Sequence, residues 1–93
     1  MAEVRRPRAD EAETAARLLH ASAADMYDRF AGGRERALRV LRRSLDEPGN
    51  ASSAEVVWVA AVDDKVAGAM AAFPVDEAAI RARAFLRLAL RGS

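Results

Sequence analysis

The stretch that decides the fold is EVVWVAAVDDKVAGAMAAFP, from Glu55 to Pro74. It contains two apolar runs, residues 56–62 and 66–73, on either side of Asp63-Asp64. Aspartate tolerates left-handed backbone better than most residues, so the sequence predicts a tight turn within an antiparallel hairpin. Neither run carries a charge, and the odd and even positions of the first run are both apolar. We therefore expect helices on both faces of the sheet, with Trp58 in the core.

The residues before the hairpin predict a strand followed by a helical stretch. Residues 4–8 are expected as a short strand that ends near its proline, because proline cannot donate to a central ladder. Asp10 and Glu13 have the spacing of a capping box, so a helix is expected to begin there. Apolar residues then recur every three or four positions as far as Gly32-Gly33. The pattern leaves open whether Ser22 divides this stretch into two helices.

Residues 34–49 predict a further helix, with one apolar face and a stop at Pro48-Gly49. The tail fits two structures. Every even position from 80 to 90 is apolar, as in a strand, yet Ala82, Phe85 and Ala89 also share one helical face. Alanine, leucine and arginine are strong helix formers, so we expect a helix.

These elements predict an α+β fold for residues 1–93, taken as a single domain. It comprises a short N-terminal strand, a helical stretch, an antiparallel hairpin and a C-terminal helix, with the sheet covered by helices. The chain has 93 residues, of which 23 are alanine, and no cysteine. A chain this short buries about 60–65% of the surface that its unfolded form exposes, so a partner surface is expected. The lack of cysteine excludes disulfides and thiolate chemistry.

Charge and hydropathy argue against nucleic-acid and membrane partners. Fifteen basic residues against fourteen acidic ones give a net charge of +1, without a clustered positive excess. No run of about 18 uncharged apolar residues occurs, and the N-terminus is charged rather than signal-like. We therefore expect a cytoplasmic protein. The glycosylation pattern Asn50-Ala51-Ser52 is attributed to chance.

Two phrases resemble the GNAT superfamily of N-acetyltransferases. VRRPRADEAETAARLL, residues 4–19, resembles that family's first strand running into its first helix. VWVAAVDDKVAGAMAAFP, residues 57–74, resembles its second and third strands, with their acidic turn. The resemblance implies the front half of a GNAT fold, and acetyl transfer from acetyl-CoA to an amine as the ancestral reaction.

In the resembled family a fourth strand leads into a glycine-rich loop, Q/R-x-x-G-x-G/A, whose backbone N–H groups hold the pyrophosphate of acetyl-CoA. The five glycines of this sequence do not have that spacing. The family's thiolate-protonating tyrosine also falls beyond the matched residues, so the resemblance assigns no catalytic residue. We therefore expect a partial domain that is inactive as given, with acetyl-CoA as cofactor if the complete fold is assembled and otherwise none.

Tyr27 and Phe30 are the candidate substrate-binding residues, because the resembled family places its acceptor cleft beside the end of the first helical region. Core packing is the simpler role for both. His20, the one histidine in the sequence, is interpreted as a helix flank rather than a general base. Five arginines between residues 34 and 43 are interpreted as a solvated helix face. No metal site is predicted.

The alternative to an enzyme is a small homodimeric interaction module. The second strand of the hairpin is the third strand of the predicted sheet, and this sequence supplies no fourth strand beside it. Its outer edge is therefore apolar and carries unpaired backbone groups. Such an edge is expected to recruit a second copy of the chain.

Overall fold

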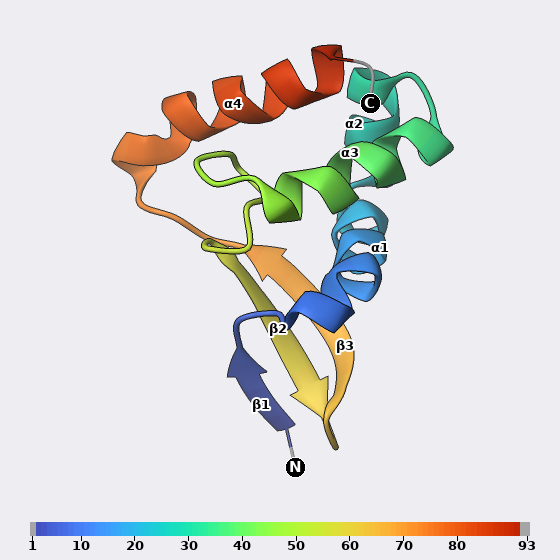
Figure 1. Ribbon diagram of the computed structural model, residues 1–93, viewed down its shortest axis with the longest axis vertical. Coiled ribbons are helices and arrows are strands. Elements are labelled where there is room, and N and C mark those ends of the chain that lie inside the picture. Colours follow the sequence, from blue (N-terminus) through green and yellow to red (C-terminus); the bar gives the residue numbers. More distant parts are fainter. Residues whose placement is uncertain (1, 92–93) are drawn as a thin grey trace.

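The computed structural model describes residues 2–91, and within that range the side chains of residues 28, 30 and 31 lie outside the description. The order of elements is strand, helices, hairpin and helix, so the predicted α+β fold is confirmed (Figure 1). The strands are β1 (Ala2–Arg5), β2 (Val57–Val62) and β3 (Lys65–Ala71), and the helices are α1 (Ala12–Ser22), α2 (Ala24–Ala31), α3 (Arg34–Asp46) and α4 (Ala78–Leu90). Short 3-10 turns at Ala9–Glu11 and Val75–Glu77 precede α1 and α4.

The sheet is antiparallel with the order β1-β2-β3. Asp63 and Asp64 form the two-residue turn between β2 and β3, and both have positive φ, 50° and 67°. These left-handed angles are those of a type I′ turn, whose twist matches that of the flanking strands. The expected hairpin is therefore confirmed, and its register shifts once, between Ala60 and Ala61.

Helices cover one face of the sheet, and the expectation of two covered faces is wrong. Val57, Val59 and Ala61 of β2 are fully buried on the covered face. The side chains on the other face remain accessible: Val4 is 71% exposed and Met70 is 59% exposed.

Trp58 belongs to the open face, so its expected place in the core is also wrong. It is half-buried opposite Met70 on β3, and the Arg6 guanidinium lies 3.7 Å from the centre of its ring. This contact covers part of the indole while leaving both groups near water.

The asymmetry follows from the way the helices stack. α1 packs against β3, and α3 packs against α1 and α2. α4 packs on α2 and α3 instead of crossing to the far face of the sheet (Figure 1). The helix contacts with the sheet, from α1 to β3 and from Leu41 and Leu45 of α3 to Val57 and Val59 of β2, therefore fall on one face.

The start of the helical region differs from the prediction by a few residues. β1 ends at Arg5 instead of Arg8, and the first helical turn begins directly after Pro7 and Arg8. Glu11, not Glu13, supplies the capping carboxylate, since its Oε1 accepts from the Arg8 N–H at 2.8 Å. Proline lacks an N–H and cannot extend the ladder of β1, so the strand ends before Pro7.

Two helices are separated near Ser22, which settles the question that the sequence left open. Ala23 leaves the helical region with φ −152°, and the Ser22 hydroxyl donates to the Leu19 carbonyl at 2.7 Å. α2 ends before Gly32, whose φ of 86° is the left-handed conformation expected after a helix. Residues 80–90 lie in α4, so the helix expected in the tail is confirmed.

The connection from α3 to β2 is built around Asn50, whose side chain is 1% exposed. Its amide donates to the carbonyls of Ser44 and Glu47 at 3.0 and 2.9 Å. Its Oδ1 accepts from the Ser52 N–H at 2.8 Å. The enclosed amide is therefore a structural group that ends α3, and it is not available for glycosylation in the folded chain.

Across residues 2–91, none of the helices combines the length and apolar character needed to span a bilayer.

Candidate functional site

An apolar groove of the size of a small-molecule site lies beneath α4, and we call it the α4 groove. Its volume is about 490 Å³, and α2, α4, β3 and the segments next to them supply its walls. The larger side chains that line it are Met26, Tyr27, Phe73, Phe85 and Leu86. Alanines occupy most of the remaining wall, and the polar members among the described lining residues are Ser52 and Arg83.

Tyr27, a candidate substrate-binding residue, lines the α4 groove. Its ring lies 6.5 Å from the ring of His20 and 5.9 Å from that of Phe85, measured between centroids. Tyr27 is half-buried and packs against both clusters of the core. Tyr27 therefore packs against the core and also forms part of a cavity wall, and its role in substrate binding stays a prediction. The side chain of Phe30, the other candidate, lies outside the described residues.

Arg81 fixes the start of α4 above the groove. Its guanidinium donates to Glu77 at 2.8 Å, to Glu55 at 3.1 Å and to the Asn50 carbonyl at 3.1 Å. It also lies over the ring of Phe73, at 5.7 Å from the centroid. These contacts join α4 to the loop before β2 and to the end of β3. Arg81 is thus a positioning residue for the groove.

The hydrogen bonds around Arg81 and Glu55 favour the charged form of each side chain. The Gly49 N–H donates to the Glu55 carboxylate, and this bond, followed by that of Arg81, lowers the pKa of Glu55 below its ordinary value. The carboxylates of Glu77 and Glu55 raise the pKa of Arg81. At neutral pH Glu55 and Arg81 are therefore both charged.

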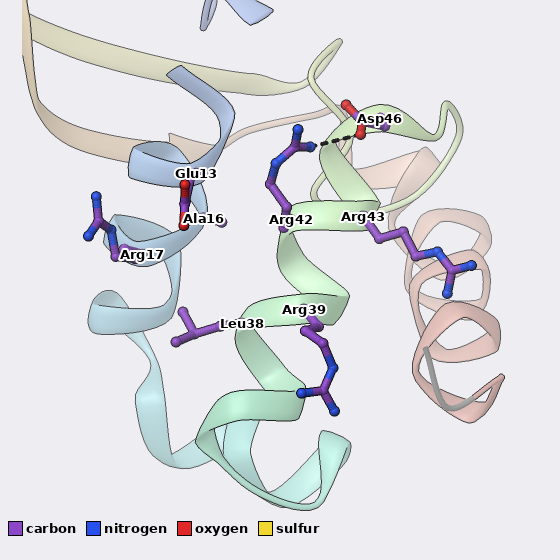
Figure 2. A pocket seen from close by; sticks show the side chains of 8 residues that line it. All are labelled: Glu13, Ala16, Arg17, Leu38, Arg39, Arg42, Arg43 and Asp46. Atoms are coloured by element: carbon purple, nitrogen blue, oxygen red, sulfur yellow. Dashed lines mark hydrogen bonds and ion pairs between the residues drawn. The ribbon is translucent and has the colours of Figure 1, made fainter. Parts of the chain in front are cut away.

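A larger hollow of about 690 Å³ lies between α1 and α3, and Figure 2 shows the side chains that line it. Arg17, Arg39, Arg42 and Arg43 contribute positive charge there, and Glu13 and Asp46 contribute negative charge. Arg42 donates to Asp46 at 2.7 Å. In Figure 2 the guanidinium groups of Arg17 and Arg43 extend to opposite sides. The arginines do not converge on one point, so this hollow has the character of a solvated, charged surface.

His20 is buried at 6% exposure instead of lying on a helix flank, and it stacks against Tyr27. A buried ring beside an aromatic neighbour has little access to a substrate proton. Among residues 2–91, no three His, Asp or Glu side chains are grouped as metal ligands.

Sequence reasoning missed Phe73 and Arg83 as lining residues of the groove and Arg81 as the residue that positions α4. The signal for Phe85 was present, because it lies on the apolar helical face predicted for the tail. Arg81 offered no such signal, since its partners Glu55 and Asn50 are remote in sequence and meet it only after folding.

Comparisons with protein-family models, with curated protein sequences and with solved structures found no match.

Proposed function

We propose that this domain is the acceptor-binding half of a GNAT-type N-acetyltransferase, which transfers an acetyl group from acetyl-CoA to an amine. The observation that carries the proposal is the topology: β1, a helical stretch, then the antiparallel β2–β3 hairpin. The resembled family begins in the same order, with one or two helices where this chain has three. The phrases that resemble the family lie on β1–α1 and on β2–β3. The α4 groove, with Tyr27 in its wall, is the proposed place for the apolar part of the acceptor, with the reacting amine outside the groove.

The cofactor site belongs to the same proposal. Within residues 2–91, β3 pairs with β2 alone, so its outer edge can accept a further strand. In the resembled family that strand leads into the glycine-rich loop that binds acetyl-CoA. The 93-residue sequence contains no such loop, so the loop would come from a segment added at the β3 edge. A cytoplasmic location is proposed with it, on the composition and charge described above.

Calorimetric titration with acetyl-CoA tests this proposal. The chain alone is expected to give no heat. A synthetic polypeptide that carries an apolar strand, an R-x-x-G-x-G loop and a short helix is then added to complete the sheet. The completed complex is expected to bind acetyl-CoA at micromolar concentration and to release free thiol with an amine acceptor.

The matched control is the same polypeptide with alanine in place of the loop glycines, because a Cβ obstructs the close approach of pyrophosphate to the backbone. It should pair with β3 without binding the cofactor. A complex that forms through β3 and binds no acetyl-CoA with the intact loop would contradict the proposal.

A second candidate function is homodimerisation through the β3 edge. The observation that favours it is the combination of that edge with accessible apolar side chains on the open face of the sheet, Val4, Val62 and Met70. Two copies that pair their β3 strands would satisfy the backbone groups of both edges and place their apolar open faces side by side in one sheet.

Light scattering across a concentration series tests the homodimer. The native chain is expected to dimerise, and Met70→Lys is expected to yield a monomer, since a lysine on an edge strand disfavours pairing with another chain. Leu90→Lys is the control, because Leu90 is 74% exposed on α4, away from the sheet. A native chain that stays monomeric at high concentration would remove this candidate.

A further inference from the structure

We propose that the α4 groove binds a small amphipathic anion, with an apolar body inside the groove and a carboxylate at Arg83. This inference rests on the groove alone and does not depend on acetyl transfer.

The walls of the groove select the apolar body of the ligand. Tyr27, Phe73, Phe85 and Leu86 supply aromatic and aliphatic surface, and small alanine side chains leave the space between them open. A volume of about 490 Å³ lies within the range of roughly 300–1,000 Å³ that is typical of small-molecule sites. Apolar surface enclosed in this way gains about 25 cal/mol for each Å² removed from water.

The charge at the groove selects an anion over a cation. The described residues of its wall include Arg83 and no aspartate or glutamate. An ammonium group would therefore find no carboxylate in the wall and would meet a like charge. A carboxylate would meet a guanidinium that can donate two parallel hydrogen bonds.

Arg83 is exposed and is not committed to another group, in contrast to its neighbour Arg81. Arg81 is held by Glu77, by Glu55 and by the Asn50 carbonyl. Within the part of the chain that the structure describes, no carboxylate forms an ion pair with Arg83. Arg87 lies four residues further along the helix and adds positive potential on the same side.

The test is calorimetric titration with octanoate, hexanoate and octylammonium, each below its micelle-forming concentration. Octanoate is expected to bind, and hexanoate to bind about 15-fold more weakly, since each buried methylene contributes about a fourfold change in affinity. Octylammonium carries the same chain with the opposite charge and is expected to bind more weakly than octanoate. Shifts of amide resonances in α4 and β3 should accompany octanoate binding.

Three variants locate the site. Arg83→Gln is expected to weaken octanoate binding about two- to fivefold, the range for a solvent-accessible ion pair, and Arg87→Gln, outside the groove wall, by less. Ala82→Trp places a large side chain in the groove from an exposed position and is expected to abolish binding, with circular dichroism confirming the fold.

Several outcomes would overturn the proposal. No octanoate binding, equal binding of octylammonium, or unchanged affinity in Arg83→Gln would remove the anion site. Unchanged affinity in the folded Ala82→Trp variant would place the ligand elsewhere. Resonances of the groove that shift on dilution, without ligand, would make a second copy of the chain its occupant.

Discussion

At the scale of single residues, Arg5 and Glu11 tie the first strand to the start of the helices. The Arg5 guanidinium donates to both carboxylate oxygens of Glu11, at 2.7 and 2.8 Å. Arg5, and then the Arg8 N–H, lower the pKa of Glu11 from its ordinary value of 4.5 to about 2. The two-pronged geometry holds the carboxylate where it caps the first helical turn.

The Arg5–Glu11 ion pair makes the free energy of unfolding depend on pH. Because the pKa of Glu11 in the folded chain lies below its ordinary value of 4.5, its contribution is present above pH 4.5 and is lost as pH falls toward about 2. Glu11→Gln should remove that part of the acid dependence, as measured by urea unfolding between pH 2 and pH 6. Glu13→Gln, exposed on α1, is the control. An unchanged acid profile in Glu11→Gln would show that the pair does not contribute.

Asn50 is the other residue on which local structure depends. Its buried amide makes the hydrogen bonds that satisfy the carbonyls of Ser44 and Glu47 and the N–H of Ser52. A buried polar group that loses its partner costs about 1–3 kcal/mol. With one side chain, Asn50 thus supplies the hydrogen-bond donors that the carbonyls at the end of α3 would otherwise lack.

Asn50→Ala is expected to lower the free energy of unfolding by about 2–4 kcal/mol, because several backbone groups lose their partner at once. Chemical denaturation measures this loss. Asp46→Ala, which breaks only the exposed pair with Arg42, should change stability by less than about 1 kcal/mol. A loss in Asn50→Ala no larger than that in the control would contradict the assigned role.

At the scale of elements, α4 is attached by few contacts of different kinds. Leu88 and Ala89 pack with Ala37 and Val40 near its C-terminal end, and Arg81 holds its first turns. Between these two attachments the helix borders the groove. Its position therefore depends on a side-chain network in addition to apolar burial.

Arg81→Gln should loosen α4 while the sheet stays intact, because the variant loses the contacts to Glu55 and Glu77. Amide hydrogen exchange should become faster in residues 78–90 and remain slow in β2. Arg87→Gln keeps the Arg81 network and is the matched control. Equal exchange rates in α4 of Arg81→Gln and the native chain would show that apolar packing alone positions the helix.

At the scale of the whole molecule, the core consists of two clusters that meet at α3. The larger one joins α1, α3 and β2, and the smaller one joins α3 to α4. Leu41 is fully buried in the larger cluster. A chain of this length has a free energy of unfolding of about 5–14 kcal/mol, so a single large cavity consumes much of its stability.

Leu41→Ala is expected to cost about 2–5 kcal/mol, the range for a buried leucine truncated in a packed core. Thermal unfolding followed by circular dichroism provides the measurement. Leu90→Ala removes the same atoms from a side chain that is 74% exposed and should change stability by less than about 0.5 kcal/mol. Similar losses in both variants would mean that the larger cluster is not the main source of stability.

The sequence by itself determined the elements whose signals are local. Asp63-Asp64 predicted the hairpin turn, Gly32-Gly33 the end of α2, and helix propensity the state of the tail. The energies behind these features act over a few residues, through backbone sterics and hydrogen bonds along the chain. They therefore remain readable when nothing of the tertiary structure is known.

Only the tertiary structure decided which face of the hairpin is covered and where the groove lies. The two faces of β2 are almost equally apolar in sequence, so pattern alone could not distinguish Val59, which is buried, from Trp58, which is half-buried on the open face. The packing of α1 and α3 against one face of the sheet determines which side chains of β2 are buried. The groove likewise depends on Arg81 meeting Glu55 and Asn50, because a contact between residues distant in sequence is determined by the packing of whole elements.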